Sequence, residues 1–191
     1  MRAVRFIMFL LACIFLIWMV VFLLSRAFSS GSSSRPEELK RADLSSYESS
    51  TASVYIDGPI VLDQEHHALR ITVDHNEARI QKIVGYEGRV EEERSYPKTT
   101  DSYVVFLKAL EQAAFMDGDT TSKETEVGKC PQNNRYVFAL ENSGEQVFRY
   151  WKTPCGQGTF NGDAEQTMWL FRSQIPSKDF SDITNDLLMS Y

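Results

Sequence analysis

Two cysteines carry the clearest chemistry in this sequence of 191 residues. Cys130 and Cys155 lie on either side of a hairpin that alternating apolar residues predict over 135–152. With the turn at Ser143, the two cysteines meet at the open end of this hairpin, one residue out of register. Because a disulfide needs Cα atoms about 5.5 Å apart, this arrangement predicts a Cys130–Cys155 disulfide. The alternative is two unpaired buried thiols, and the missing Cys-x-x-Cys spacing argues against a redox role.

The hairpin register also predicts which aromatic side chains face the core. Residues along a strand alternate between the two faces of a sheet. Tyr136 is expected opposite Tyr150 and Phe138 opposite Phe148, so these four share the core face. Trp169, further along the chain, is also more typical of a core than of a ligand platform.

One aromatic residue of the hairpin falls on the opposite face. Trp151 points away from the core face, together with Val147 and Arg149. If nothing covers this second face, the three residues form an exposed apolar spot. Such a spot is typical of an interaction site, so they are the candidate partner surface.

The glycine-spaced run 156–162 has the composition of a phosphate-binding loop but not its pattern. A dinucleotide fingerprint needs glycine at position 161, which is Asn161, and a parallel strand–helix–strand context. The strand before this run belongs to a hairpin instead. A tight connection into a helix is therefore the preferred interpretation, and no cofactor is predicted.

Metal-binding and catalytic patterns are incomplete. The run 117–121 begins like a calcium loop, but its sixth position is Ser122 instead of glycine and its twelfth is Gly128 instead of glutamate. His66 and His67 are adjacent, so on a strand they would point to opposite faces. The sequence contains no Gly-x-Ser-x-Gly and no His-Glu-x-x-His motif. No catalytic residue and no metal ligand is predicted.

The charge of the chain outside its N-terminal region restricts its partners. Residues 54–191 carry 14 Lys or Arg and 22 Asp or Glu, a formal charge of −8. An acidic domain repels the phosphates of nucleic acids and of anionic lipids. Nucleic acid is therefore excluded as an expected partner.

The N-terminal region predicts a membrane anchor. Residues 6–24 contain no charged residue, proline or glycine, and as a helix they would span about 28 Å, close to the hydrocarbon core of a bilayer. A cleaved signal peptide is the alternative, but its apolar region is normally about 7–15 residues long. We expect a retained single-pass transmembrane helix over 6–24.

Flanking charges predict the topology of the chain. Arg2 and Arg5 precede the apolar run, and positive residues favour the cytoplasmic side. Residues 1–5 are therefore expected as a cytoplasmic tail of a cell-membrane protein. Residues 25–53, rich in serine, are expected as a flexible tether, and residues 54–191 as an extracytoplasmic domain.

Apolar periodicity predicts an α+β fold for residues 54–191. Strands are expected over 69–73, 79–84, 89–96, 135–140 and 145–152, and helices over 100–115 and 163–175. Each half of the domain is then a hairpin followed by a helix. The expected architecture is an antiparallel sheet built from two hairpin–helix units, with the helices on one face.

A set of residues in the last third of the chain resembles a known group of sequences. The set is Cys130-Pro131, Arg135-Tyr136, Trp151, Cys155-Gly156, Gly158-Thr159-Phe160 and Gly162. It resembles uncharacterised membrane-anchored extracytoplasmic proteins of reduced-genome bacteria. The resemblance implies an anchored protein of the cell envelope and assigns neither an activity nor site residues.

Three functions are compatible with these features. The first is a membrane-tethered binding module for an envelope protein or cell-surface partner, since the chain combines an anchor, a tether and a small domain. The second is a small envelope enzyme with dispersed carboxylates, which would require a deep cleft. The third is an assembly subunit that pairs through an exposed sheet edge.

Overall fold

The computed structural model describes Met19 and residues 44–185. The expected tail 1–5, the rest of the expected span 6–24, and the expected tether up to residue 43 lie outside the described residues. Within the described residues, no helix is long and apolar enough to cross a membrane. The anchor and its orientation therefore stay predictions.

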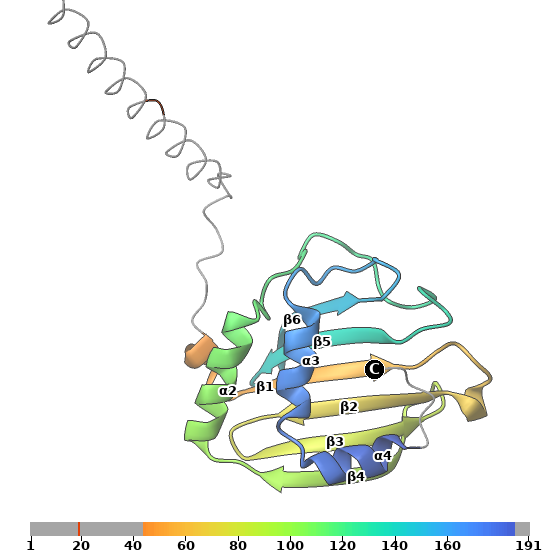
Figure 1. Ribbon diagram of the computed structural model, residues 1–191, viewed down its shortest axis with the longest axis horizontal. Coiled ribbons are helices and arrows are strands. Elements are labelled where there is room, and N and C mark those ends of the chain that lie inside the picture. Colours follow the sequence, from red (N-terminus) through yellow and green to blue (C-terminus); the bar gives the residue numbers. More distant parts are fainter. Residues whose placement is uncertain (1–18, 20–43, 186–191) are drawn as a thin grey trace, which may run out of the picture. The chain divides into compact units, whose positions relative to one another are not determined.

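The described residues form an α+β fold around one antiparallel sheet (Figure 1). Its six strands lie in the order β4-β3-β2-β1-β5-β6. Their bounds are β1 Ser50–Asp57, β2 His67–Val73, β3 Glu77–Val84, β4 Arg89–Pro97, β5 Arg135–Asn142 and β6 Glu145–Lys152. The helices are α2 Thr100–Gln112, α3 Ala164–Arg172 and α4 Ser177–Thr184, with short 3-10 turns η1 Leu44–Tyr47 and η2 Asp63–Glu65.

The helices cover one face of the sheet, as the sequence predicted (Figure 1). Buried residues of α2, α3 and α4 share a single hydrophobic core with one face of the strands. In α2, Tyr103, Phe106, Leu107 and Leu110 recur at helical spacing and are buried. Their apolar stripe fixes α2 against the sheet.

The start of the folded domain differs from its predicted position at residue 54. Residues 44–53, assigned to the tether, include η1 and the first half of β1, and Leu44 is fully buried. β1 pairs with β2 on one side and with β5 on the other, so both edges of its backbone are hydrogen-bonded. Its buried residues alternate with half-buried ones, and its first half, Ser50 to Ser53, has the composition of the serine-rich segment before it. Long-range pairing, and not local composition, orders this segment.

The central position of β1 also corrects the plan of two hairpin–helix units. β2, β3 and β4 form a three-stranded meander before α2, and β5 and β6 form a hairpin before α3. β1 joins these two groups and belongs to neither. The sheet is therefore not a simple duplication of one unit.

The register of the β5–β6 hairpin is shifted by two residues from the predicted one. Phe138 pairs with Tyr150, and Leu140 pairs with Phe148. The turn has two residues, Ser143 and Gly144, both with positive φ, and a bulge beside Leu140 adds a further shift. Because the shift is even, the predicted core face is correct.

A buried hydroxyl ties α2 to the start of β1. The Tyr103 side chain is fully buried, and its hydroxyl donates a hydrogen bond of 2.9 Å to the carbonyl oxygen of Ser50. Burial raises the pKa of this phenol to about 12, so the neutral donor persists throughout the physiological pH range. This contact holds the first strand residue against the helix layer.

We expect Tyr103→Phe to lower the free energy of unfolding by about 1 kcal/mol, because it removes a buried hydrogen bond to the Ser50 carbonyl oxygen. Urea unfolding followed by circular dichroism measures the change. The control is Val105→Ala at a position that is 66% exposed on the same helix, which should change stability by less than about 0.5 kcal/mol. Equal effects of the two variants would contradict the role of the hydroxyl.

Candidate functional site

The predicted disulfide is present in the structure. Cys130 and Cys155 are bonded, with their Cα atoms 5.9 Å apart. The bond joins the loop before β5 to the segment that follows β6. Export of the domain stays a prediction.

The predicted partner surface is not exposed at its central residue. Trp151 does point away from the main core, but only 2% of its surface is accessible. Its indole Nε1 donates a 2.9 Å hydrogen bond to the carbonyl oxygen of Glu124. The loop between α2 and β5 therefore crosses this face of the sheet and covers the indole. Trp151, Arg149 and Val147 therefore do not form the exposed apolar spot expected from the sequence, because Val147, 38% exposed, is the one accessible apolar residue among them. Their role as a partner surface stays a prediction.

An ion pair holds this covering loop in place. Both carboxylate oxygens of Glu126 accept hydrogen bonds from the guanidinium of Arg149 on β6. Burial raises the pKa of Glu126, but the hydrogen bonds and charge of Arg149 lower it by more, so the net pKa lies below its ordinary value of 4.5. Arg149 therefore acts as a clamp for the loop.

The clamp predicts an acid-dependent loss of stability. The folded-state pKa of Glu126 is depressed, so ionised Glu126 adds to the free energy of unfolding. This stabilisation is fully present above about pH 4.5 and is lost as the pH falls through the lower folded-state pKa. We expect Glu126→Gln to remove this part of the pH dependence. Urea unfolding at pH values between 3 and 7 measures it, with wild type as reference. Parallel stability curves for the two proteins would contradict the prediction.

The glycine-spaced run is a tight connection, as preferred from the sequence. The backbone N–H groups of Thr159 and Phe160 both donate to the carbonyl oxygen of Trp151, at 2.8 and 3.0 Å. A Cβ at Gly158 would lie 2.4 Å from that same oxygen, which explains why this position has no side chain. These N–H groups are used within the chain and do not form a phosphate cradle.

A buried polar cluster, missed by the sequence reasoning, fixes the loop between β1 and β2. Asp57, the last residue of β1, accepts hydrogen bonds from Arg135 at 2.7 and 2.8 Å, and His66 Nε2 lies 2.9 Å from its other oxygen. His66 stacks on Tyr86 with ring centroids 4.0 Å apart. Arg135 and His66 are each 1% exposed. Their sequence positions are far apart, so no local spacing could have indicated the cluster.

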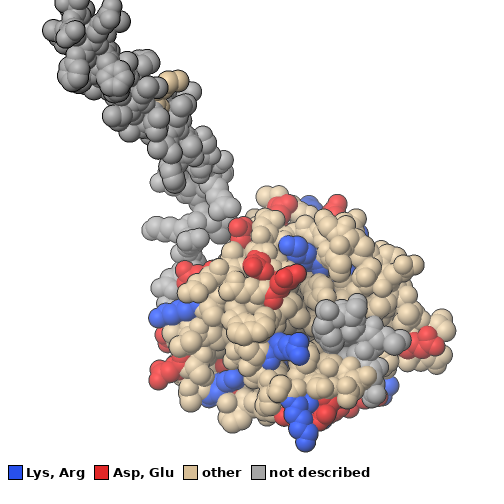
Figure 2. Space-filling view, in the orientation of Figure 1, with Lys and Arg blue, Asp and Glu red and all other residues tan. Residues whose placement is uncertain are grey.

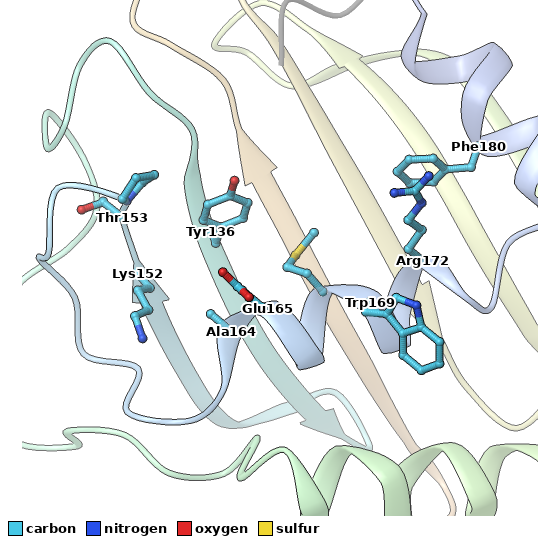
Figure 3. A pocket seen from close by; sticks show the side chains of 10 residues that line it. Tyr136, Lys152, Thr153, Ala164, Glu165, Trp169, Arg172 and Phe180 are labelled. Carbon is cyan, nitrogen blue, oxygen red and sulfur yellow. The ribbon is translucent and has the colours of Figure 1, made fainter. Parts of the chain in front are cut away.

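A groove in the described surface lies beside α3, and we call it the α3 groove. Its volume is about 450 Å³, within the range typical of ligand sites. One wall is α3, with Ala164, Glu165, Met168, Trp169 and Arg172. The other boundaries are Tyr136 of β5, Lys152, Thr153 and Pro154 at the end of β6, and Phe180 of α4 (Figure 3).

Local sequence signals position both walls of the α3 groove. Asp163 caps α3 by accepting a hydrogen bond from the backbone N–H of Gln166, and side chains four residues apart then line the groove in two adjacent rows. A Cβ at Gly162 would lie 2.4 Å from the carbonyl oxygen of Ala114, so glycine lets α3 start close to the end of α2. The disulfide at Cys155 fixes the opposite wall next to Pro154.

Trp169 lies at the rim of this groove and not in the core. Its side chain is 65% exposed, whereas its neighbours Leu170 and Phe171 are buried. The expectation of a core tryptophan is therefore wrong. The helical stripe of α3 could have revealed this, because Trp169 does not fall on the side that carries Phe171 and Ile175.

The groove carries both charges but has an excess of positive charge. Lys152 and Thr153 lie at one end, and Arg172 lies at the other end with its guanidinium 4.8 Å from the centre of the Phe180 ring (Figure 3). Among the described residues that line the groove, Glu165 is the single carboxylate. Around it, acidic and basic side chains are interspersed on the face that carries the helices (Figure 2). A local excess of cations in an acidic domain favours a ligand with a carboxylate.

Comparison with known proteins gives no family assignment. No protein-family model matches the chain, and no curated protein sequence matches it. In the part of the chain that the structure describes, no group of three or more His, Cys, Asp or Glu side chains is arranged to hold a metal ion. The function must therefore be argued from the α3 groove itself.

Proposed function

We propose that the domain is a membrane-tethered binding module of the cell envelope, and that its α3 groove holds an extended, apolar peptide segment with an adjacent carboxylate. The observation that carries the proposal is the α3 groove, where an apolar lining is flanked by Lys152 and Arg172. Its volume accommodates a few side chains and not a whole helix. The tether and anchor of this proposal are those predicted from the sequence.

The apolar lining supports binding through side-chain burial. Met168 on α3 and Tyr136 on β5 are partly buried against the core, and Phe180 is almost fully buried. Methionine adapts its shape to different apolar partners, and an exposed tryptophan such as Trp169 adds a large contact area. These properties suit a site that receives apolar side chains.

The charges at the two ends support recognition of an acidic flank. Arg172 is exposed and already lies against an aromatic ring, an arrangement that leaves its donors available to a carboxylate. Lys152 provides a second cation at the opposite end. A ligand with a carboxylate beside its apolar residues can therefore be oriented along the groove.

The sheet edges support the alternative of edge pairing less well. The outer strand β4 carries Glu91, Glu92, Glu93 and Arg94 in succession, and charged edge strands resist pairing with another chain. At the other edge, the end of β6 is already bonded by the segment 157–160, which accepts from and donates to residues 151 and 153.

A peptide selection tests the proposed function. Random seven-residue peptides are selected against the full chain in lipid nanodiscs and against a chain ended at Asn185, so that residues beyond α4 cannot mask binding. We expect enrichment of sequences with two or three consecutive apolar residues next to Asp or Glu. Met168→Glu should abolish the enrichment, and Val105→Glu, at an exposed site on α2, should not. Peptides that bind wild type and Met168→Glu equally would refute the proposal.

A further inference from the structure

We propose that the loop between β1 and β2 forms a second interaction surface, and that its partner is a protein with an apolar pocket bordered by Lys or Arg. This surface, which we call the apolar tip, consists of Ile60, Val61 and Leu62 of that loop and Tyr86 of the turn between β3 and β4. The four side chains are between 41% and 65% exposed. None of them lines the α3 groove, so the apolar tip is separate from the proposed function.

The apolar tip differs from the scattered apolar residues that any protein surface carries. Single exposed apolar side chains are common and need no partner. Among the described residues, Ile60, Val61 and Leu62 are the three consecutive large apolar residues that are all exposed. They follow the end of β1 that lies away from α2, where their loop projects from the sheet (Figure 1). A contiguous apolar patch at such a position is typical of a protein interface.

Tyr86 holds the end of the loop in place. Its hydroxyl donates a 2.9 Å hydrogen bond to the carbonyl oxygen of Val61 and lies 3.1 Å from the backbone nitrogen of the same residue, whose N–H donates to it. In the opposite direction, the backbone N–H of Tyr86 donates a 2.7 Å hydrogen bond to Asp63 Oδ1. The Tyr86 ring also stacks on His66, which contacts the Asp57 carboxylate. The loop and the turn are therefore fixed to each other.

The base of the loop is fixed to the segment that leads into β5. The backbone N–H of Ile60 donates a 2.8 Å hydrogen bond to the carbonyl oxygen of Pro131, next to the disulfide at Cys130. Arg135 donates to the carbonyl oxygen of Gly58. Because the backbone is held at both its base and its end, the apolar side chains stay turned outward. A partner can bind them without first ordering the loop, which lowers the entropic cost of association.

The charges around the apolar tip determine the chemistry of its partner. Residues 58–66 and 85–88 contain Asp63, Glu65 and Glu87 but no Lys or Arg. All three acidic residues are exposed, and acidic side chains lie beside uncharged ones at this end of the domain (Figure 2). Opposite charges across an interface attract and like charges repel. A pocket that receives the apolar side chains and carries Lys or Arg at its border therefore complements the tip.

The same charges disfavour two other occupants. A membrane that contains anionic lipids repels three carboxylates beside the inserting side chains. A second copy of the chain that docked tip to tip would bring the same three negative charges against them. Each of these occupants gives a distinct product in a crosslinking experiment.

Photo-crosslinking tests the identity of the occupant. Leu62→benzoylphenylalanine is introduced into the full chain in the cells that carry its gene, and the crosslinked products are identified by mass spectrometry. We expect a covalent adduct with a peptide of another protein that has Lys or Arg beside apolar residues. Val105→benzoylphenylalanine, at an exposed site on α2, is the control and should not give this adduct. An adduct with a lipid acyl chain, an adduct with a second copy of the chain, or no adduct beyond the control would overturn the proposal.

Affinity measurements test the apolar part of the recognition, because capture alone does not show which groups bind. The purified partner is titrated against the full chain in nanodiscs. Leu62→Ser should weaken binding about ten-fold, since it removes one leucine side chain from the interface. Val105→Ser and, in the α3 groove, Met168→Glu should leave the affinity unchanged. Leu62→Ser and Val105→Ser are at exposed sites, so both should unfold at the same urea concentration as wild type.

Salt dependence tests the charged part of the recognition. Raising NaCl from about 50 mM to about 500 mM should weaken binding of wild type, because salt screens exposed charges. The double variant Glu65→Gln, Glu87→Gln should bind more weakly than wild type at low salt and respond less to NaCl. Equal affinities of wild type and Leu62→Ser would overturn the apolar tip as the binding surface. A wild-type affinity that does not fall with salt would overturn the basic border of the partner.

Discussion

Asp57→Ala is expected to lower the free energy of unfolding by about 3–5 kcal/mol, because it leaves the guanidinium of Arg135 buried without its carboxylate partner. The side chain of Arg135 is only 2% exposed, and it donates two hydrogen bonds to Asp57. Since the whole stability of a domain is about 5–15 kcal/mol, the variant should be close to unfolding.

The measurement is urea unfolding of the full chain in nanodiscs, followed by tryptophan fluorescence. The matched control is Lys129→Gln, which removes an exposed ion pair with Glu124 whose charged atoms are 3.5 Å apart. Exposed pairs typically contribute less than about 1 kcal/mol, so this control should remain close to wild type. A similar small change in Asp57→Ala would show that the cluster around Arg135 does not hold the fold together.

A second variant separates the loss of charge pairing from the loss of the hydrogen-bonded shape. Asp57→Asn keeps a side-chain acceptor for Arg135 but removes the negative charge. We expect its stability to lie between those of wild type and Asp57→Ala. The loop between β1 and β2 should become more sensitive to proteases in Asp57→Ala, since His66 then also loses its contact with residue 57.

Removal of the Cys130–Cys155 disulfide is expected to lower the free energy of unfolding by about 3 kcal/mol. The bond closes a loop with a sequence separation of 25 residues, and cross-linking such a loop restricts the unfolded chain by about that amount. The double variant Cys130→Ala, Cys155→Ala lacks the disulfide without any treatment with reductant. Chemical unfolding of the double variant and of wild type measures the difference.

Treatment with reductant provides the control for this second prediction. Reduced wild type should match the double variant, and reductant should leave the double variant unchanged. The segment that carries Pro154 forms one wall of the α3 groove, so the double variant should also bind a selected peptide more weakly. Unchanged unfolding in the double variant would contradict a structural role for the bond.

Much of the domain could be predicted from local patterns in the sequence. Alternation over β2 and β3 and the helical stripe of α2 each depend on side chains within one element, so the periodicity of burial is visible in the sequence. The disulfide was predictable because a hairpin with a short turn places its two ends close together. The face of Trp151 was predictable for the same reason.

The tertiary structure alone decided which of these surfaces are free. Trp151 is buried because the loop before β5 folds across it, a contact that no strand periodicity encodes. Asp57, His66 and Arg135 meet because β1 lies between β2 and β5, and this strand is held by pairing on both edges. The α3 groove likewise exists only where α3, α4 and the end of β6 come together. The sequence by itself determined β2 to β6, α2, α3 and their inward faces, since these depend on local spacing. Long-range packing determined the place of β1, what covers the other faces and where the chain can bind.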